Sequence, residues 1–167
     1  LPIKRVIVSH YHADHFYGLQ VFKQAGAEIW AYKDARGQTG TEAAQLRLEQ
    51  RKEILFPWVN EQTKLLAPDV YLEGDTDFKL GGVQFSIRHV GPAHSTEDLA
   101  MLVKGDGVLY AGDLVFKGRV PYVGEADSKA WLASLDKLIA MRPRVLVPGH
   151  GAASTTPLKD LKLTRDY

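Results

Sequence analysis

The sequence predicts an α+β fold, in which packed β-sheets are covered by helices. Two observations support this class. Short apolar runs rich in β-branched residues alternate with segments of helical periodicity in the N-terminal part of the chain. Further along, closely spaced strands include a hairpin signalled by Asp106-Gly107. No repeat, low-complexity tract or Pro/Gly/Ser linker interrupts the 167 residues, so we expect one domain over residues 1–167.

Four segments of the N-terminal part carry a regular pattern. They are a strand over residues 3–9, a helix over 14–24, a strand over 27–32 and a helix over 41–55. Asp14 and Thr41 are the candidate N-caps of the two helices. Gly26 and Pro57 lie just beyond their ends, where such residues stop helices.

The remainder is predicted mainly as strands, with two further helices. The strands cover residues 70–72, 78–80, 83–90, 99–103, 108–111 and 144–147, and the helices cover 129–141 and 157–167. Ser128 is the candidate N-cap of the first of these helices, and Pro143 stops it. Its Trp131, Leu135 and Leu138 are expected to face inward.

Composition and charge exclude several classes of protein. The 21 Lys+Arg and 20 Asp+Glu give a formal charge of +1, which offers no electrostatic case for a nucleic-acid partner. The absence of Cys excludes disulfides, thiolate zinc sites and cysteine nucleophiles. No apolar run approaches the ~18 residues of a membrane span. The expected partner is a small-molecule substrate rather than nucleic acid or a membrane.

Residues 10–15 contain four potential metal ligands, at the junction of the first predicted strand and the helix that follows it. His10 and His12 are two apart, so in extended backbone both rings project to the same side. Asp14 and His15 stand at the helix start and can aim at a neighbouring point. Imidazole nitrogen and carboxylate oxygen are ligands that zinc accepts. This density favours a metal site over a solvated polar loop.

Three more candidate ligands follow apolar strands. His94 lies in the Gly/Pro turn of residues 91–95. Asp113 stands at the end of the apolar strand predicted over residues 108–111, and His150, within residues 147–151, stands at the end of the last predicted strand. Rigid sheets usually present ligands from such strand-end loops. The five His and two Asp are together enough to hold two metals.

The ordered ligand set resembles the metallo-β-lactamase superfamily of binuclear metallohydrolases. The resemblance implies an αββα sandwich with two zinc ions at one edge, or iron or manganese in their place. It assigns His10, His12 and His94 to the first metal, Asp14, His15 and His150 to the second, and Asp113 to both. Asp14 and Asp113 are the catalytic candidates, with a proton-shuttling or outer-sphere role for Asp14 as the alternative to ligation.

Residues 110–128 resemble the branch associated with bacterial sulfur oxidation and quinoprotein-linked relay systems, and Ala111-Gly112-Asp113 is similar to hydroxyacylglutathione hydrolases. Family β-lactamases commonly carry Cys or Ser at the bridging position, so Asp113 favours a thioester or ester hydrolase. The implied mechanism uses hydroxide shared by two metals. The alternatives are a persulfide dioxygenase with one iron and a metal-binding fragment without turnover.

Five polar residues near these motifs have more than one interpretation. Lys117 and Arg119 either bind a substrate carboxylate or carry ordinary surface charge. Glu97 and Asp98 either orient the preceding histidine through a hydrogen bond or form a solvated pair. His89 is expected to face away from the apolar side of its strand and to pack at the surface or behind a ligand.

Only nine residues precede His10, whereas members of the superfamily carry several strands before this motif. We therefore expect part of a longer protein, without its N-terminal strands and with its last helix unfinished. An exposed sheet edge invites pairing with another copy, so a homodimer or strand exchange is expected. The resembling branch implies export to the periplasm, with the cytoplasm as the alternative location.

Overall fold

The structure is a computed structural model that describes residues 1–167. It divides into two compact units, Leu1–Glu73 and Gly74–Tyr167, and each has its own β-sheet and apolar core. The predicted α+β class is confirmed. None of the helices combines the length and the apolar character needed to cross a membrane.

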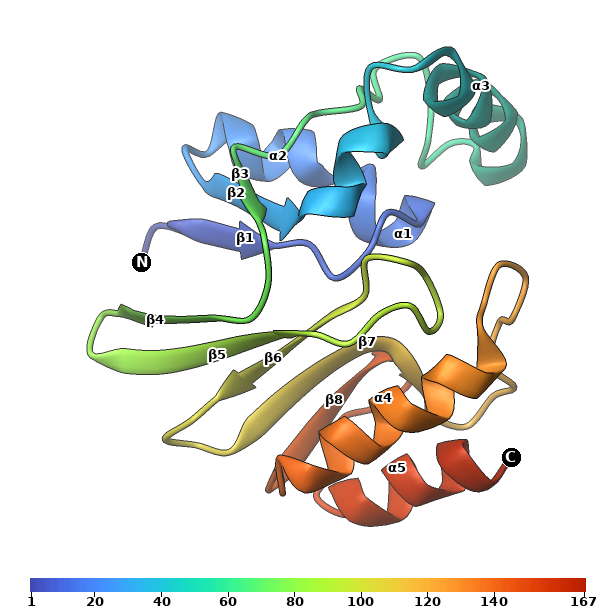
Figure 1. Ribbon diagram of the computed structural model, residues 1–167. Coiled ribbons are helices and arrows are strands. Elements are labelled where there is room, and N and C mark those ends of the chain that lie inside the picture. The colour runs from blue at the N-terminus through green and yellow to red at the C-terminus, as the bar shows by residue number, and fades with distance from the viewer. The chain divides into compact units, whose positions relative to one another are not determined.

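The first unit is a three-stranded parallel sheet with helices in its connections (Figure 1). The strand order is β1-β2-β3. In chain order the elements are β1 (Arg5–Ile7), α1 (Ala13–Phe16), α2 (Leu19–Gln24), β2 (Glu28–Tyr32), the 3-10 helix η1 (Lys33–Gln38), α3 (Glu42–Leu55) and β3 (Val70–Leu72). Val8, Phe16, Leu19, Ile29 and Leu48 are among the residues of its core.

Two expectations for this unit need correction. The predicted helix over 14–24 is broken into α1 and α2, because Tyr17 ends the first and Gly18, a poor helix former, precedes the second. Asp14 is not an N-cap: His12 occupies that position and Asp14 lies in the first turn. The cap of α3 is confirmed, since Thr41 Oγ1 accepts the Ala44 N–H at 3.1 Å.

The second unit is a five-stranded sheet of order β4-β5-β6-β7-β8. Its elements are β4 (Thr76–Leu80), β5 (Val83–His89), β6 (Leu99–Val103), β7 (Val108–Phe116), α4 (Ser128–Ala140), β8 (Val145–His150) and α5 (Pro157–Asp166). The first four strands are antiparallel, and β8 joins β7 in parallel after the α4 crossover. Both α4 and α5 pack against β7, and Figure 1 shows them side by side.

Helix α4 is amphipathic, and its Trp131, Leu135 and Leu138 are buried as expected. Its N-cap is Asp127 rather than Ser128, since Asp127 Oδ1 accepts the Ala130 N–H at 2.9 Å. A carboxylate and a hydroxyl in consecutive positions compete for this role, and sequence alone does not rank them here.

Strands β7 and β8 run further than the predicted 108–111 and 144–147. The polar Asp113 and the Pro148-Gly149 pair interrupt the apolar pattern, which is why both strands were expected to end early. Leu114, Val115 and Phe116 nevertheless stay buried and keep β7 in the sheet. The candidate ligands Asp113 and His150 therefore lie within paired strands.

Candidate metal centre

The first unit holds four of the seven predicted ligands on one short segment. Val8 and Phe16 flank the segment and are both buried in the core of this unit. The Val8 N–H also donates to the Trp30 carbonyl at 2.8 Å, which extends the pairing beyond β1. Residues 9–15 are thus anchored to the core at both ends, which restricts the positions of their side chains.

The rings of His10 and His12 meet edge to face, with centroids 4.7 Å apart and His10 Nε2 3.1 Å from His12 Nδ1. Extended backbone at His12, with φ −62° and ψ 151°, produces this approach, as the two-residue spacing predicts. Ser9 Oγ lies 3.1 Å from His10 Nδ1 on the other side of the buried His10 ring. Two imidazole nitrogens therefore converge on one point.

Asp14 and His15 form the second pair of this segment. Both lie in the single turn of α1, with Asp14 Oδ2 3.2 Å from His15 Nε2. Asp14 is exposed and His15 is half-buried. The His15 ring also lies 4.3 Å, centroid to centroid, from the His10 ring, so the two pairs are neighbours within this unit.

In the second unit, His94 is held by the loop between β5 and β6. The side chain is 1% exposed, and its Nδ1 lies 3.0 Å from the Tyr122 carbonyl oxygen. A carbonyl can only accept, so Nδ1 carries a proton, and in the neutral ring Nε2 then carries the lone pair. This lone pair faces Asp113 Oδ2 at 3.4 Å.

Asp113 owes its direction to an irregularity in β7. The pairing of β7 with β8 shifts register on both sides of Gly112, whose φ of 54° is a conformation that glycine adopts readily. Such a bulge re-aims the next side chain. The Asp113 carboxylate is 3% exposed, and Oδ2 lies 3.3 Å from His150 Nε2 as well as near His94.

Gly149 makes room for this carboxylate. A Cβ at residue 149 would lie 1.9 Å from Asp113 Oδ1 and 2.7 Å from the Gly112 carbonyl carbon, distances that real atoms do not tolerate. Only glycine therefore allows β8 to pass so close to Asp113 in this arrangement. The ring of Phe116 stacks on His150, with centroids 5.2 Å apart and planes 16° from parallel.

These distances fit a divalent metal. Two ligand atoms about 2.1 Å from a tetrahedral ion lie about 3.4 Å apart. The contacts of Asp113 Oδ2 with His94 and His150 are 3.4 and 3.3 Å. A carboxylate oxygen that faces a neutral imidazole lone pair is repelled by it, so positive charge is needed between them, and either a bound metal ion or a proton on the imidazole supplies it.

Glu97 and Asp98 are buried at 2% and 1% exposure, which excludes the solvated-pair interpretation. Asp98 does not contact His94 directly through its carboxylate but accepts two hydrogen bonds from Ser95, the next residue. Burial raises the pKa of Asp98 to about 7, against the opposing effect of the Ser95 hydrogen bonds. The negative charges of Glu97 and Asp113 raise that pKa further.

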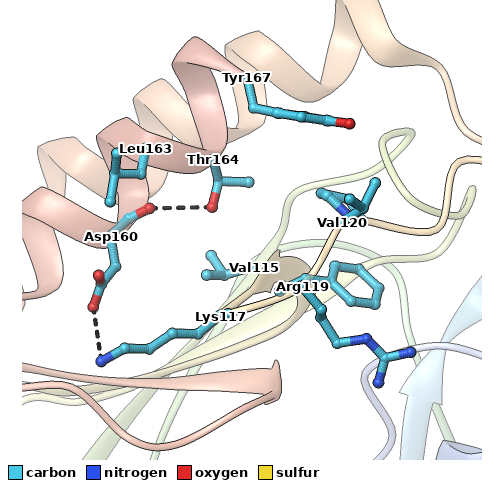
Figure 2. Close-up of a pocket in the computed structure, with 11 residues that line it drawn as sticks. Val115, Lys117, Arg119, Val120, Asp160, Leu163, Thr164 and Tyr167 are labelled. Carbon is cyan, nitrogen blue, oxygen red and sulfur yellow. Dashed lines mark hydrogen bonds and ion pairs between the residues drawn. The ribbon is translucent and has the colours of Figure 1, made fainter.

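Lys117 and Arg119 line a cavity of about 220 Å³ between the end of β7 and α5. Figure 2 shows Lys117 directed at Asp160, with Nζ 3.2 Å from Oδ2, while Arg119 turns away from α5. The Arg119 guanidinium lies 5.9 Å from the centroid of the Phe116 ring. The lysine is thus engaged in an ion pair, and the two cations have different surroundings.

His89 lies outside both groups of candidate ligands. Its Nε2 is 3.1 Å from the Thr96 carbonyl oxygen, so the ring packs on the loop that carries His94. The expected orientation needs correction, because residue 89 has the parity of Val83 and Ile87 and alternation puts it on their face of β5.

Three contributors to the site were not foreseen from the sequence. The Tyr122 carbonyl is a backbone group and leaves no sequence signal. Phe116 looked like an ordinary strand residue, although it contacts His94 as well as His150. Gly149 did stand in a Pro-Gly-His run, and that run was the one available signal of close backbone approach.

Comparison with known proteins agrees with this geometry. The family profile described as "Metallo-beta-lactamase superfamily" matches residues 1–150. A linear primary-alkylsulfatase of a Pseudomonas strain is 24% identical over 99% of this chain and 38% of its own length. A beta-lactamase-like protein 2 homolog of Drosophila melanogaster is 27% identical over 93% of this chain and 47% of its own length. The chain thus spans less than half of each of these relatives.

A solved structure shows the same fold. An archaeal metallo-beta-lactamase superfamily protein from Sulfolobus tokodaii superposes with a TM-score of 0.77 at 21% identity, over 98% of this chain and 66% of that one. At this level of identity the likeness concerns the fold, and the metallo-β-lactamase fold expected from the sequence is confirmed.

Proposed function

This chain belongs to the metallo-β-lactamase superfamily, and from that premise we propose that it is a metal-dependent hydrolase of small thioesters or esters. The observation that carries the proposal is the environment of Asp113. One carboxylate oxygen faces two imidazole nitrogens, that of His94 in the β5–β6 loop at 3.4 Å and that of His150 at the end of β8 at 3.3 Å. A buried carboxylate in that position is suited to be shared between two cations.

We propose two zinc ions as the cofactor. His10, His12 and His94 are the ligands proposed for the first ion, and Asp14, His15 and His150 for the second, with Asp113 shared. When bound, such a pair supplies Lewis acidity and lowers the pKa of a shared water towards 7. The residues of this chain then have separable tasks. The Tyr122 carbonyl fixes the tautomer of His94, and the Phe116 ring shields one face of His150 from water.

The choice of a thioester or ester rests on Asp113, because family β-lactamases commonly carry Cys or Ser at that position. The two curated relatives widen the set of substrates worth testing to a linear alkyl sulfate and a β-lactam. Arg119 is the better candidate of the two cations for a substrate carboxylate, because Lys117 is already paired with Asp160.

The test is a substrate panel on zinc-loaded protein, with metal content measured on the same sample. We expect about two zinc ions per chain and chelator-sensitive hydrolysis of a thioester or ester. Asp77→Asn serves as the matched variant, since Asp77 is an exposed carboxylate of the same unit that pairs with Lys104 and Arg88.

A folded, fully metallated chain that is inactive on every substrate would contradict hydrolysis and favour metal binding without turnover. One iron per chain with oxygen consumption would instead support the dioxygenase alternative. Activity restricted to the alkyl sulfate or the β-lactam would keep the metal centre and overturn the substrate class.

A further inference from the structure

We infer that Asp98 is a positioning residue for the metal centre. By binding Ser95 through both carboxylate oxygens, it fixes the loop from which His94 presents its Nε2. This inference rests on the proposed function for its metal, but its argument comes from the loop itself. Asp98 acts here through Ser95 and His94, without a contact to the ion.

The loop of residues 90–98 is closed by Asp98 at two levels. Its backbone carbonyl accepts the N–H groups of Val90 at 2.8 Å and Gly91 at 3.2 Å. Its carboxylate accepts the Ser95 N–H at 2.7 Å and the Ser95 Oγ–H at 2.8 Å. One residue thus holds both the start of the loop and the residue directly after His94.

The base of the loop is tightly packed, so it cannot shift to hold His94 in place when the hydrogen bonds between Ser95 and Asp98 are lost. A Cβ at Gly91 would lie 2.4 Å from the Thr96 carbonyl oxygen. The Asp127 N–H, at the start of α4, donates to the Ala93 carbonyl at 2.9 Å. These contacts fix the two sides of the loop, and the Ser95–Asp98 hydrogen bonds fix its tip, where His94 stands.

Burial makes this clamp unusual. Asp98 is 1% exposed, and a carboxylate there is unfavourable unless its hydrogen bonds are strong. Its neighbour Glu97 is 2% exposed, and Asp113 adds a further negative charge. Burying three acidic groups near one another is unfavourable, because each must either lose hydration as a carboxylate or stay protonated. Cations at the candidate metal centre would offset their repulsion, which favours a role tied to metal binding over a purely structural one.

The experiment compares zinc affinity among variants of the full chain, measured by competition with a chromophoric chelator. Asp98→Asn keeps the size of the side chain but replaces one acceptor with a donor facing Ser95. We expect its zinc affinity to fall about 10–100-fold, the usual effect of losing a partner that orients a ligand. Ser95→Ala should weaken binding in the same direction, and Ser95→Thr, which keeps the hydroxyl, should restore it.

A second Ser–Asp hydrogen bond in the same unit supplies the control. Ser86 Oγ donates to Asp77 Oδ1 at 2.6 Å on the neighbouring strands β5 and β4, outside the loop. Asp77→Asn and Ser86→Ala remove the same chemistry and should leave zinc affinity unchanged. The visible spectrum of the cobalt-substituted protein should shift in Asp98→Asn and not in Asp77→Asn, because only the former displaces a ligand.

Equal zinc affinity in Asp98→Asn and the parent, or equal losses in Asp98→Asn and Asp77→Asn, would overturn the inference. If Asp98→Asn does not fold, the comparison of Ser95→Ala with Ser95→Thr decides, since failure of threonine to restore affinity also overturns it. If the parent binds no metal, the proposed function fails. The NMR signal of the His94 Nδ1 proton in metal-free protein then decides: a shift in Ser95→Ala supports the clamp, and an unchanged signal contradicts it.

Discussion

The two units present their candidate ligands in opposite ways. In the first unit four ligands lie within six consecutive residues, on one segment anchored by Val8 and Phe16. In the second, His94, Asp113 and His150 come from three separate segments, and a bulge, a glycine and a hydrogen-bonded loop bring them together. The first set is therefore a property of local sequence, and the second is a property of the folded sheet.

The two sets of ligands therefore differ in which substitutions disrupt them. A local ligand segment tolerates changes elsewhere, because its geometry needs only an extended residue and one helical turn. An assembled set depends on residues that never touch the metal. Substitutions in each of the two sets of ligands, and in the residues that support them, test this difference.

The largest effect is expected from Asp113→Ala. It removes the carboxylate whose Oδ2 lies within 3.4 Å of His94 Nε2 and 3.3 Å of His150 Nε2. We expect loss of one or both metals and a fall in kcat/KM of more than about 100-fold, since even partners of ligands contribute 10–100-fold. Metal analysis and steady-state kinetics measure this, with Asp77→Asn as the control, since it alters an exposed carboxylate paired with Lys104 and Arg88 and should do little to either. Equal metal loss in both variants would show that the ligands are wrongly assigned.

Gly149→Ala tests the assembled set without altering a ligand. The added Cβ would lie 1.9 Å from Asp113 Oδ1, so the carboxylate must leave its position. We expect zinc affinity to fall about 10–100-fold while the protein stays folded. Gly105→Ala is the matched control, because a Cβ at residue 105 meets nothing within 4 Å. Unchanged affinity in Gly149→Ala would mean that Asp113 does not need its observed position.

The free energy of unfolding of the metal-free protein should depend on pH through Asp98. Burial raises the pKa of Asp98 from 3.8 to about 7, with Glu97 and Asp113 adding to the shift. The unfolded chain therefore releases this proton near pH 4 and the folded chain only near pH 7. The Asp98 contribution is fully present below pH 4 and is lost as pH rises through 7. Urea unfolding at several pH values should show this decline, and Asp98→Asn should flatten it. A decline of the same steepness in Asp98→Asn would assign it to another group.

The smallest effects are expected at the two helix caps, one in each unit. Thr41→Ala removes the acceptor for the Ala44 N–H in α3, and Asp127→Ala removes the acceptor for the Ala130 N–H in α4. Each should lower the free energy of unfolding by about 1 kcal/mol. Zinc affinity should stay constant in Thr41→Ala, since α3 contributes no ligand. A large loss of zinc affinity in Thr41→Ala would contradict the expectation that the local ligand segment tolerates changes elsewhere.

Much of the fold could be predicted because its signals are local. The Thr41 cap of α3, the periodicity of α4 and the apolar runs of β1, β2 and β6 identify these elements without tertiary information. The break at Gly18 did have a local signal, since glycine is a poor helix former, but the apolar periodicity of residues 14–24 outweighed it in the prediction. The extension of β7 through Asp113 could not be foreseen, because packing overrides the local pattern there. Sequence periodicity carries no information on how far a neighbouring strand will hold a segment in the sheet.

The candidate site also has a part that local sequence predicts and a part that depends on tertiary structure. The grouping of His10, His12, Asp14 and His15 follows from their spacing alone. Asp98 is buried and bound to Ser95, whereas the sequence suggested a solvated residue or a bond to His94. This outcome depends on the closure of the loop around the Asp98 backbone carbonyl, which the sequence does not reveal. Hydrogen bonds to backbone groups, like that of His94 with Tyr122, have no side-chain signature.

The proposed metal centre requires Asp113 to be shared by two metal ions. The most direct measurement is anomalous diffraction at the zinc and iron absorption edges from a crystal of the zinc-loaded protein. We predict two zinc peaks about 3.5–4 Å apart, with the Asp113 carboxylate between them. A single peak, or peaks that do not contact Asp113, would contradict the account.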